Sequence, residues 1–412
     1  MTLPSTEGQP VRARNGKDDQ RVAFIQYGDY LGTVERFRQG GEETYFAQRY
    51  SVDLVERLPQ FHTHVTVLTV QSRPHDVVLP SGVRCVGITG KPYQADGARE
   101  ILQWLEEYSP TSVVVRVPNI PVIRWCLQTG RRVLPTLADS FQHGGFRPRF
   151  RFFTWKLKNL LNREAIRFVA NHQLPACRDL VRIGVDPAKV LPWDWPSPSS
   201  PSDFAVKSSA AVPGRLSIMF AGKVCKAKGV GDLIRAVARL NRSGVAARAT
   251  IAGDGDIKEF KAMARESGVG DHVEFAGLVP HHQVLALMRQ SDVVVVPSRH
   301  AYGEGLSMVI FEALTTRSPL VVSDHPMFVS SLDDGKSALF FREKNPDALA
   351  SRLRELVEDA SLYNRLSSQS EEAWQRLRIP LLWGDLIERW LSGRDEDLNW
   401  LSRFTLKNHA YV

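Results

Sequence analysis

In the second half of the chain, short apolar runs alternate with amphipathic stretches. Segments such as VGDLIRAVARLNRSG and DIKEFKAMARESG repeat apolar side chains every three or four residues, which is typical of helices with one buried face. Strands that alternate with such helices predict right-handed βαβ units and a mainly parallel sheet. The apolar runs between the helices begin near Leu216, Arg248, His272, Asp292, Pro319 and Ala338.

The first half repeats this rhythm less regularly. Its apolar runs span residues 22–27, 65–70, 85–88, 112–117, 132–137 and 166–170. A polar stretch rich in proline and serine, Pro196–Ser202, separates the halves and is typical of a stiff linker. Because a chain of 412 residues is also longer than a domain with one hydrophobic core usually is, we expect two α/β domains.

These patterns predict five consecutive segments. Residues 1–20 are polar and lack the apolar stretch of a secretory signal, which predicts a disordered tail. An N-terminal domain is expected over 21–195, a linker over 196–213 and a C-terminal domain over 214–375. The last segment, 376–412, contains the amphipathic stretch IPLLWGDLIERWLSG with no strand after it. We expect this helical segment to run back toward the N-terminal domain.

Composition narrows the class of protein. Hydrophobic residues make up 43% of the chain and charged residues 24%, and no run approaches the roughly 18 apolar residues of a membrane span. The net charge of +8 favours anionic partners, but it is spread out and no nucleic-acid-reading motif accompanies it, so nucleic acid is not expected. Four cysteines without paired spacing argue against disulfides or zinc and favour the cytosol: Cys85, Cys126, Cys177 and Cys225.

The segment from 291 to 320, SDVVVVPSRHAYGEGLSMVIFEALTTRSPL, carries the most chemistry. The run Val293–Val296 predicts a strand buried on both faces. A loop with Glu304 follows, and then a helix that starts near Ser307 and contains Glu312. Open α/β sheets bind ligands at this end of their strands, and the first N–H groups of a helix attract anions. The alternative is an amphipathic helix with two solvated glutamates.

A second loop, in the sequence MFAGKVCKAKGV, carries two lysines. Gly222 and Lys223 follow a predicted strand, and Lys228 precedes a predicted helix. From one loop the two lysines can reach opposite sides of a diphosphate, with roughly 1.5–3 kcal/mol for each charge-assisted bond. A solvated basic turn is the alternative interpretation.

A third loop, in the sequence IAGDGD, combines two glycines with two carboxylates. Gly253 and Gly255 allow the backbone to turn tightly and to approach a ligand. Asp254 and Asp256 also have the spacing of a metal-binding DxD pair. Because the two lysines already supply positive charge for phosphates, we predict no metal site.

The first half offers two weaker candidates. Gly40 and Gly41 precede a helical pattern that starts near Glu43, which suggests a close approach of backbone to a phosphate or an acceptor. An ordinary pair of loop glycines explains them equally well. Asp139 and His143 follow the run 132–137 and are candidates for the same cleft, although a lone histidine is more often structural.

Together these motifs resemble the retaining GT-B glycosyltransferases of glycosyltransferase family 4. The resemblance is strong over residues 214–340, where GKVCKAKGV, AGDGD, HVEFAGLV, DVVVVPS and EGLSMVIFEAL occur in the family's order, and weaker over the first half. It implies two Rossmann-like domains facing across a cleft, with the nucleotide-sugar donor on the C-terminal domain and the acceptor mainly on the N-terminal one. It also implies transfer to an acceptor hydroxyl with retention, without an essential metal ion or cofactor.

The resemblance assigns roles to individual residues. Lys223 and Lys228 would bind the donor diphosphate, with Lys223 where the family usually has arginine. Glu304 would lie at the transferred sugar and Glu312 at the ribose hydroxyls, and residues near Leu278 would contact the base. Backbone N–H groups to phosphate and sugar would come from Gly305, Leu306 and Ser307.

This chain departs from the family pattern at three places. The family's donor-contacting histidine, in a His-Asp pair, is replaced by Ala138-Asp139, so Asp139 or His143 must serve in its place or the role is absent. Arg317 stands where the family usually has a glycine after the helix that contains Glu312. The positive charge of Arg317 interacts favourably with the helix dipole, but its side chain removes the easy left-handed cap that glycine provides. Trp193-Asp194-Trp195 replaces a common Asn-Gly turn before the linker.

Two alternatives to a transferase remain open from the sequence. One is an inactive or membrane-surface adaptor, because GFRPRFRFFTWKLKNLL at 145–161 alternates cationic and aromatic residues and suits an anionic headgroup layer. We favour the other interpretation of this segment, an N-terminal-domain loop and helix that pack their aromatic side chains inward. The other is a nucleotide-sugar hydrolase or epimerase of the same fold. Glu304 and Glu312 together with both lysines favour transfer, in polysaccharide, glycolipid or other glycoconjugate biosynthesis, to a sugar, lipid-linked or small-molecule acceptor.

Overall fold

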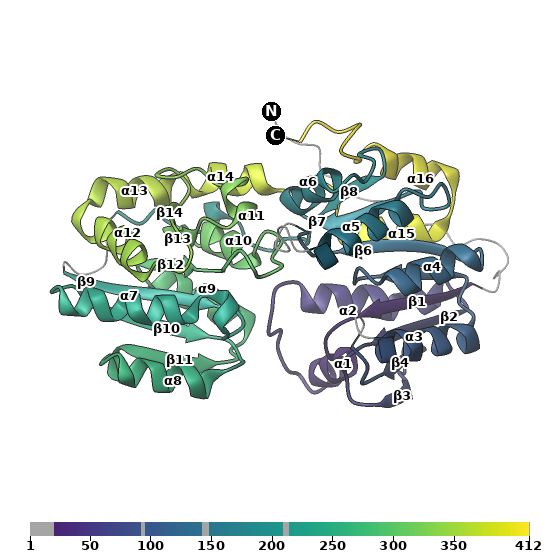
Figure 1. Cartoon of the computed structure of the whole chain (residues 1–412), viewed down its shortest axis with the longest axis horizontal. Helices are drawn as coiled ribbons and strands as arrows, with labels where there is room; N and C mark the ends of the chain where they lie inside the picture. The colour runs from purple at the N-terminus through teal and green to yellow at the C-terminus, as the bar shows by residue number, and fades with distance from the viewer. Residues whose placement is uncertain (1–19, 92–94, 142–147, 209–213, 412) are drawn as a thin grey trace.

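The computed structural model describes residues 20–91, 95–141, 148–208 and 214–411, in two α/β domains that lie side by side (Figure 1). The predicted N-terminal tail lies outside the described residues, apart from residue 20. The two-domain α/β architecture predicted from the alternating apolar runs is confirmed.

The N-terminal domain is built on an eight-stranded sheet in the order β3-β4-β2-β1-β5-β6-β7-β8. Every neighbouring pair is parallel except the edge pair β3–β4, which is antiparallel. The strands are β1 (Arg21–Gln26), β2 (His64–Thr69), β3 (His75–Val78), β4 (Val83–Gly87), β5 (Ser112–Val115), β6 (Arg132–Leu137), β7 (Val169–His172) and β8 (Val190–Trp193). The helices of this part are α1 (Tyr30–Arg38), α2 (Gln48–Arg57), α3 (Ala95–Tyr108), α4 (Ile120–Gln128), α5 (Pro148–Leu161) and α6 (Leu174–Arg182), with the 3₁₀ turn η1 (Leu58–Gln60). A second 3₁₀ turn, η2 (Pro201–Asp203), lies in the linker between the domains.

The C-terminal domain is built on a six-stranded, fully parallel sheet in the order β11-β10-β9-β12-β13-β14. The strands are β9 (Arg215–Ala221), β10 (Ala246–Ala252), β11 (Val273–Gly277), β12 (Val293–Val296), β13 (Leu320–Ser323) and β14 (Leu339–Phe341). The elements around this sheet are η3 (Lys226–Lys228), α7 (Val230–Arg242), α8 (Ile257–Glu266), η4 (Gly270–His272), α9 (His281–Gln290), α10 (Met308–Thr315), α11 (Pro326–Val329), α12 (Pro346–Glu358), α13 (Ala360–Ser368) and α14 (Ser370–Leu377).

Alternate side chains of the central strands enter cores on opposite faces of each sheet. In β12, Val293 and Val295 pack into one cluster and Val294 and Val296 into the other, and all four are buried. Continuous apolar runs are required here because helices cover both faces of a parallel sheet. The prediction of a strand buried on both faces is therefore confirmed for β12.

The last two helices, α15 (Trp383–Ser392) and α16 (Asp395–Ser402), lie against the N-terminal domain rather than the C-terminal one (Figure 1). Trp383, Leu386 and Trp390 are buried in the same cluster as Phe24 of β1. Each buried side chain of this size contributes roughly 1.5–3 kcal/mol. The end of the chain is therefore an integral layer of the N-terminal domain.

The chain crosses between the domains twice, and the two crossings pair with each other. Asp194, after β8, donates its backbone N–H to Leu381 O at 3.0 Å and accepts from Trp383 N at 2.9 Å. Trp193, Trp195 and Trp383 cluster around this point, with ring centroids 4.9 Å apart for Trp193 and Trp195 and 5.4 Å apart for Trp195 and Trp383. Where an Asn-Gly turn is common, this chain has an extended, tryptophan-packed hinge.

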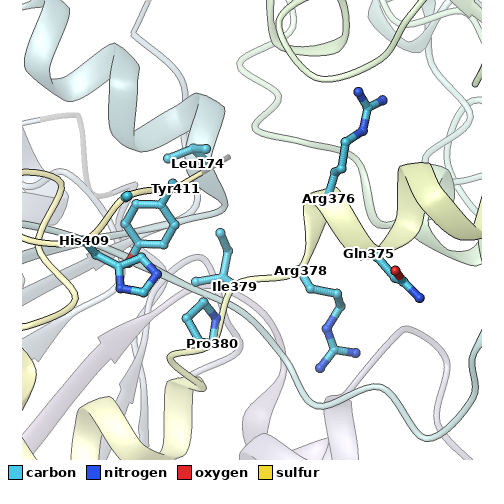
Figure 2. Close-up of a pocket in the computed structure, with 9 residues that line it drawn as sticks. Leu174, Gln375, Arg376, Arg378, Ile379, Pro380, His409 and Tyr411 are labelled. Carbon is cyan, nitrogen blue, oxygen red and sulfur yellow. The ribbon is translucent and has the colours of Figure 1, made fainter. Parts of the chain in front are cut away.

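A cavity of about 300 Å³ lies beside the second crossing (Figure 2). The side chains of Arg376 and Arg378 point away from each other on one side of the cavity. His409 and Tyr411, near the C-terminus, lie on the other side. None of the predicted donor-binding or catalytic residues lines this cavity. The lining residues are Leu174, Gln375, Arg376, Arg378, Ile379, Pro380, His409, Ala410 and Tyr411.

The structure differs locally from what the sequence patterns predict. The prediction that a helix starts near Glu43 is wrong, because α2 begins at Gln48. Gly40 and Gly41 instead end α1: their N–H groups bond to Phe37 O and Arg36 O, and Gly40 has φ 79. The sequence patterns also missed the edge strand β3 and the strand β8, whose residues Val190–Trp193 lead directly into the hinge.

Arg317 adopts the left-handed conformation that its position after α10 demands, with φ 52. For a residue with a side chain this costs roughly 1–2 kcal/mol. Its buried guanidinium offsets that strain, because Nε donates to Pro201 O at 2.7 Å and Nη2 pairs with Glu371. The arginine thus ties the end of the glutamate-bearing helix to the linker, a function that glycine could not perform.

Candidate active site

The two domains touch at the carboxyl ends of their sheets, and both predicted catalytic carboxylates lie at that seam. Asp139 follows β6, Glu304 lies in the loop between β12 and α10, and their backbones form an isolated antiparallel bridge. A Cβ on Gly305 would lie 3.5 Å from Ala138 O and 3.8 Å from His172 O. The Glu304 loop is therefore packed directly against the ends of β6 and β7.

Glu304 forms a buried ion pair with Lys228. Lys228 Nζ donates to Glu304 Oε1, and the side chains are only 11% and 7% exposed. Burial raises the pKa of Glu304, but the adjacent charge of Lys228 and its hydrogen bond outweigh burial and hold the pKa below its usual value. Glu304 is thus a carboxylate at neutral pH.

The second oxygen of this carboxylate has no ion-pair partner in the described part of the chain, although the nearby Ser298 hydroxyl helps to lower the pKa of Glu304. Glu304 Oε2 is buried and has no hydrogen-bond partner among the described residues. Leaving a buried acceptor unsatisfied costs about 1–3 kcal/mol, so a hydroxyl that donates to it is favoured. Lys228 also lies over the ring of Tyr302, with Nζ 4.7 Å from the centroid, which fixes the ammonium group on one side.

The two lysines of the β9 loop have different environments. Lys228 is buried in the turn η3, whereas Lys223 is exposed. The turn is held against β12 because Arg299 N donates to Ala227 O at 2.9 Å and a Cβ on Gly229 would lie 2.0 Å from Pro297 O. Lys228 is therefore preorganised, while Lys223 retains side-chain freedom.

The glycines of the IAGDGD loop have a structural explanation. A Cβ on Gly253 would lie 1.9 Å from Gly222 O, and one on Gly255 would lie 2.4 Å from Val224 O. The loops after β9 and β10 are thus packed backbone to backbone, which only glycine permits. Asp254 and Asp256 are exposed, and among the described residues no cluster of three or more His, Cys, Asp or Glu side chains could hold a metal ion.

The start of α10 has the predicted geometry. Ser307 is the N-cap residue, Met308 is the first helical residue, and Leu306 and Ser307 are buried. The side chain of Ser307 makes no capping bond to the first N–H groups of this helix. A helix N-terminus of this kind favours phosphate or carboxylate oxygens.

Glu312 is buried and bonded to a histidine that the sequence patterns did not single out. His281 Nε2 lies 2.7 Å from Glu312 Oε1. Burial lowers the pKa of His281, but the hydrogen bond and the charge of Glu312 outweigh burial, so the pKa lies above its usual value. The ion pair therefore contributes stability below the ordinary histidine pKa and loses it as pH rises through the higher folded value. His281 also links the domains: its N–H donates to Glu43 O at 2.8 Å, and its ring meets Phe46 at 5.4 Å.

Two more residues around Glu304 escaped sequence reasoning. His325 caps α11, donates from Nε2 to Tyr302 O at 3.1 Å and accepts from Met327 N, which defines its neutral tautomer. Burial lowers its pKa. Asn171 donates to Asp139 O at 2.9 Å from the end of β7. Both residues follow apolar strand runs, and this position at a strand end is the sequence signal that could have identified them as site residues.

The other predicted residues fall at the edges of the site or beyond it. Leu278, after β11, is 59% exposed, as a platform for a base would be. His143 lies outside the described residues. Gly40 and Gly41 belong to the cap of α1, and their assignment to donor binding stays a prediction.

Burial raises the pKa of Asp139 to about 6. Since this folded value exceeds the ordinary 3.8, the protonated form stabilises the fold at low pH, and that contribution is lost as pH rises through about 6. If the charged form supports catalysis, kcat/KM should fall below pH 6. Asp139→Asn should flatten this acid limb, as measured by pH profiles of donor turnover. An unchanged acid limb in the variant would assign it to another group.

Two α/β domains in contact at the carboxyl ends of parallel sheets, with a cation–carboxylate pair at the seam, have the architecture of the GT-B fold. The family model of glycosyl transferases group 1 matches residues 202–373. Over that segment, which is less than half of its length, the chain is therefore similar to the glycosyl transferases group 1 family.

Individual relatives agree with this class. The chain is 28% identical over 154 residues to alpha-D-kanosaminyltransferase of Streptomyces kanamyceticus, covering 37% of this chain and 39% of the relative. It is 28% identical over 205 residues to glycogen synthase of Mycobacterium tuberculosis, covering 50% and 45%. The match thus spans less than half the length of each. The crystal structure of Anabaena HepE in complex with UDP matches with a TM-score of 0.59 at 15% identity, covering 91% of this chain and 100% of HepE, which shows the GT-B fold.

Proposed function

We propose that this chain transfers a glycosyl unit from a nucleoside-diphosphate sugar to an acceptor hydroxyl, with retention of configuration and without an essential metal ion. The observation that carries the proposal is the buried Lys228–Glu304 pair at the seam with Asp139. A fixed cation and a fixed carboxylate lie together where donor and acceptor domains meet. We place the reaction in polysaccharide, glycolipid or other glycoconjugate biosynthesis.

The residues divide the work of the transfer between leaving group and sugar. A lysine has three N–H donors, and Lys228 uses one for Glu304, which leaves two for oxygens of the departing diphosphate. Lys223 closes on the diphosphate from the solvent side, and the first turn of α10 adds N–H donors. Glu304 favours positive character on the sugar ring as the bond to phosphate breaks. Such preorganised groups lower the barrier because they need no reorientation during the reaction.

The solved neighbours support the choice of donor. HepE has also been crystallised in complex with UDP-glucose and in complex with UDP and glucose. A uridine nucleotide is accordingly the first donor class to test in this chain. The acceptor is expected on the N-terminal side, at the ends of β1, β5 and β6.

Ligand-induced stabilisation and product analysis test the proposal. A nucleoside diphosphate that binds the native protein raises its melting temperature, so UDP, GDP and ADP should be compared. Turnover of the matching donor sugar should persist in a chelator. A hydrolase would release free sugar regardless of acceptor, and an adaptor would bind without turnover. Loss of activity in EDTA with rescue by manganese would assign a metal to Asp254 and Asp256.

We further propose that α5 lies on an anionic membrane surface during transfer. Of the segment 145–161, residues 145–147 lie outside the described residues. Phe150 and Phe153 pack inward, whereas Phe152 and Trp155 are 56% and 53% exposed and stack on each other at 5.9 Å. The same helix exposes Arg149 and Arg151. None of the helices within the described ranges is long and apolar enough to cross a membrane.

Replacing Phe152 and Trp155 by alanine should weaken binding to vesicles containing phosphatidylglycerol by about tenfold, since two partly buried rings together contribute on the order of 1–2 kcal/mol. Co-sedimentation measures the effect, with Val78→Ala as the control because Val78 is 64% exposed on the edge strand β3. Equal binding of the double variant and the wild-type protein would contradict a membrane role for α5.

A further inference from the structure

A single arginine lies at the carboxyl edge of the N-terminal sheet, next to the strand that leads to Asp139. Arg116 directly follows β5, which pairs with β1 on one side and with β6 on the other. Its own N–H donates to Ile25 O of β1 at 2.9 Å. Neighbouring strands are about 4.8 Å apart, so Arg116 and Asp139 lie within reach of one small molecule.

Arg116 is partly buried but has no carboxylate among the described residues. Its Nη1 donates to Gln26 Oε1 at 2.9 Å, and its guanidinium lies 5.0 Å from the ring of Trp383 and 5.8 Å from that of Trp195. No other hydrogen bond joins this guanidinium to a described residue. Arginines with comparable packing elsewhere in the chain do have acidic partners: Arg299 with Asp232, Arg317 with Glu371 and Arg389 with Asp397.

The chemistry of this arginine is incomplete without an anion. Burial lowers the pKa of Arg116, yet an arginine side chain stays charged in proteins, so the positive charge must be compensated. Two indole faces and one amide oxygen compensate it only in part, because neither carries a full negative charge. The remaining N–H groups form a planar fork that matches two oxygens of a phosphate or a carboxylate. Tyr45, 59% exposed, is close enough to act electrostatically on the guanidinium.

We propose that Arg116 binds an oxyanion, a phosphate or a carboxylate, carried by the acceptor of the transfer. The proposal rests on the proposed function only in naming that molecule the acceptor. The anion anchors one end of the acceptor beside Gln26, while the hydroxyl that receives the sugar lies one strand away at Asp139 and Glu304. Arg116 is thereby a residue that determines specificity for an acidic acceptor.

A fluorescence titration tests this site directly, because Trp195 and Trp383 line it. Inorganic phosphate and glucuronate are titrated separately into the protein at constant ionic strength, with the nucleoside diphosphate that binds it kept at saturation so that the donor phosphates are already in place. A saturable response is expected for at least one of the two anions, and the stronger one identifies the group. Arg116→Gln should weaken that response at least tenfold, and Arg116→Lys should weaken it less.

Two controls separate binding from folding. Arg132→Gln removes another arginine that lies 4.5 Å from a tryptophan ring, at the opposite end of the β6 strand, and should leave anion affinity unchanged. Nucleoside diphosphate affinity should also stay within twofold in Arg116→Gln. Equal anion affinity in Arg116→Gln and the wild-type protein, or no saturable response in the wild-type protein, would overturn the proposal. If the protein binds no nucleotide but still binds the anion through Arg116, the proposed donor is wrong and the anion site is supported.

Discussion

Lys228→Ala is expected to reduce nucleoside diphosphate affinity and donor turnover together, by about one to two decades. In the proposed function Lys228 donates to phosphate oxygens in ground state and transition state alike, and losing such a contact costs roughly 1.5–3 kcal/mol. The variant also leaves Glu304, 7% exposed, as a buried carboxylate without its cation. Breaking a buried pair in this way lowers the free energy of unfolding by roughly 3–5 kcal/mol.

Calorimetric titration with the nucleoside diphosphate and urea unfolding measure the two effects. Lys226→Ala is the matched control, because Lys226 is an exposed lysine of the same turn η3. Lys223→Arg should be tolerated better than Lys223→Ala, since a guanidinium also meets phosphate oxygens. Normal nucleotide affinity in Lys228→Ala, with the expected loss of stability, would make the lysine structural and remove the diphosphate assignment.

Glu304→Gln is expected to lower the saturated turnover by roughly 100- to 1,000-fold and to leave nucleoside diphosphate affinity within a few-fold. The substitution preserves size and can still accept the bond from Lys228, but it removes the negative charge next to the position proposed for the reacting sugar. An interaction that strengthens only in the transition state appears in kcat rather than in binding. Single-turnover measurements on the donor isolate this step.

Glu312→Gln provides the comparison within the same helix and loop. Glu312 is paired with His281 and lies deeper along α10, so its loss should weaken donor binding and the contact between His281 and the N-terminal domain. Normal turnover in Glu304→Gln would remove the catalytic assignment even with the fold unchanged. Two near-silent variants would favour the interpretation of both glutamates as structural.

Local patterning was sufficient for the elements that bury a continuous surface. The valines of β12 and the amphipathic stretches of α7 to α10 repeat with the period of the structure they form, and they fold as predicted. Shorter or partly exposed elements carry weaker signals. The edge strand β3 is largely exposed, and the polar glycine pair at 40–41 fits the end of a helix as well as the start of one.

For the site, the sequence by itself determined which residue types stand at the ends of the strands: the two lysines, the two glutamates and Asp139. Strand ends are readable from sequence because apolar runs stop there. Only the tertiary structure decided the pairing, with Lys228 bonded to Glu304, His281 to Glu312 and the Asp139 backbone to the Glu304 loop. It also decided the isolation of Arg116 from any carboxylate of the described residues. Such contacts join residues far apart in the chain, and they depend on the docking of two domains, which no local periodicity encodes.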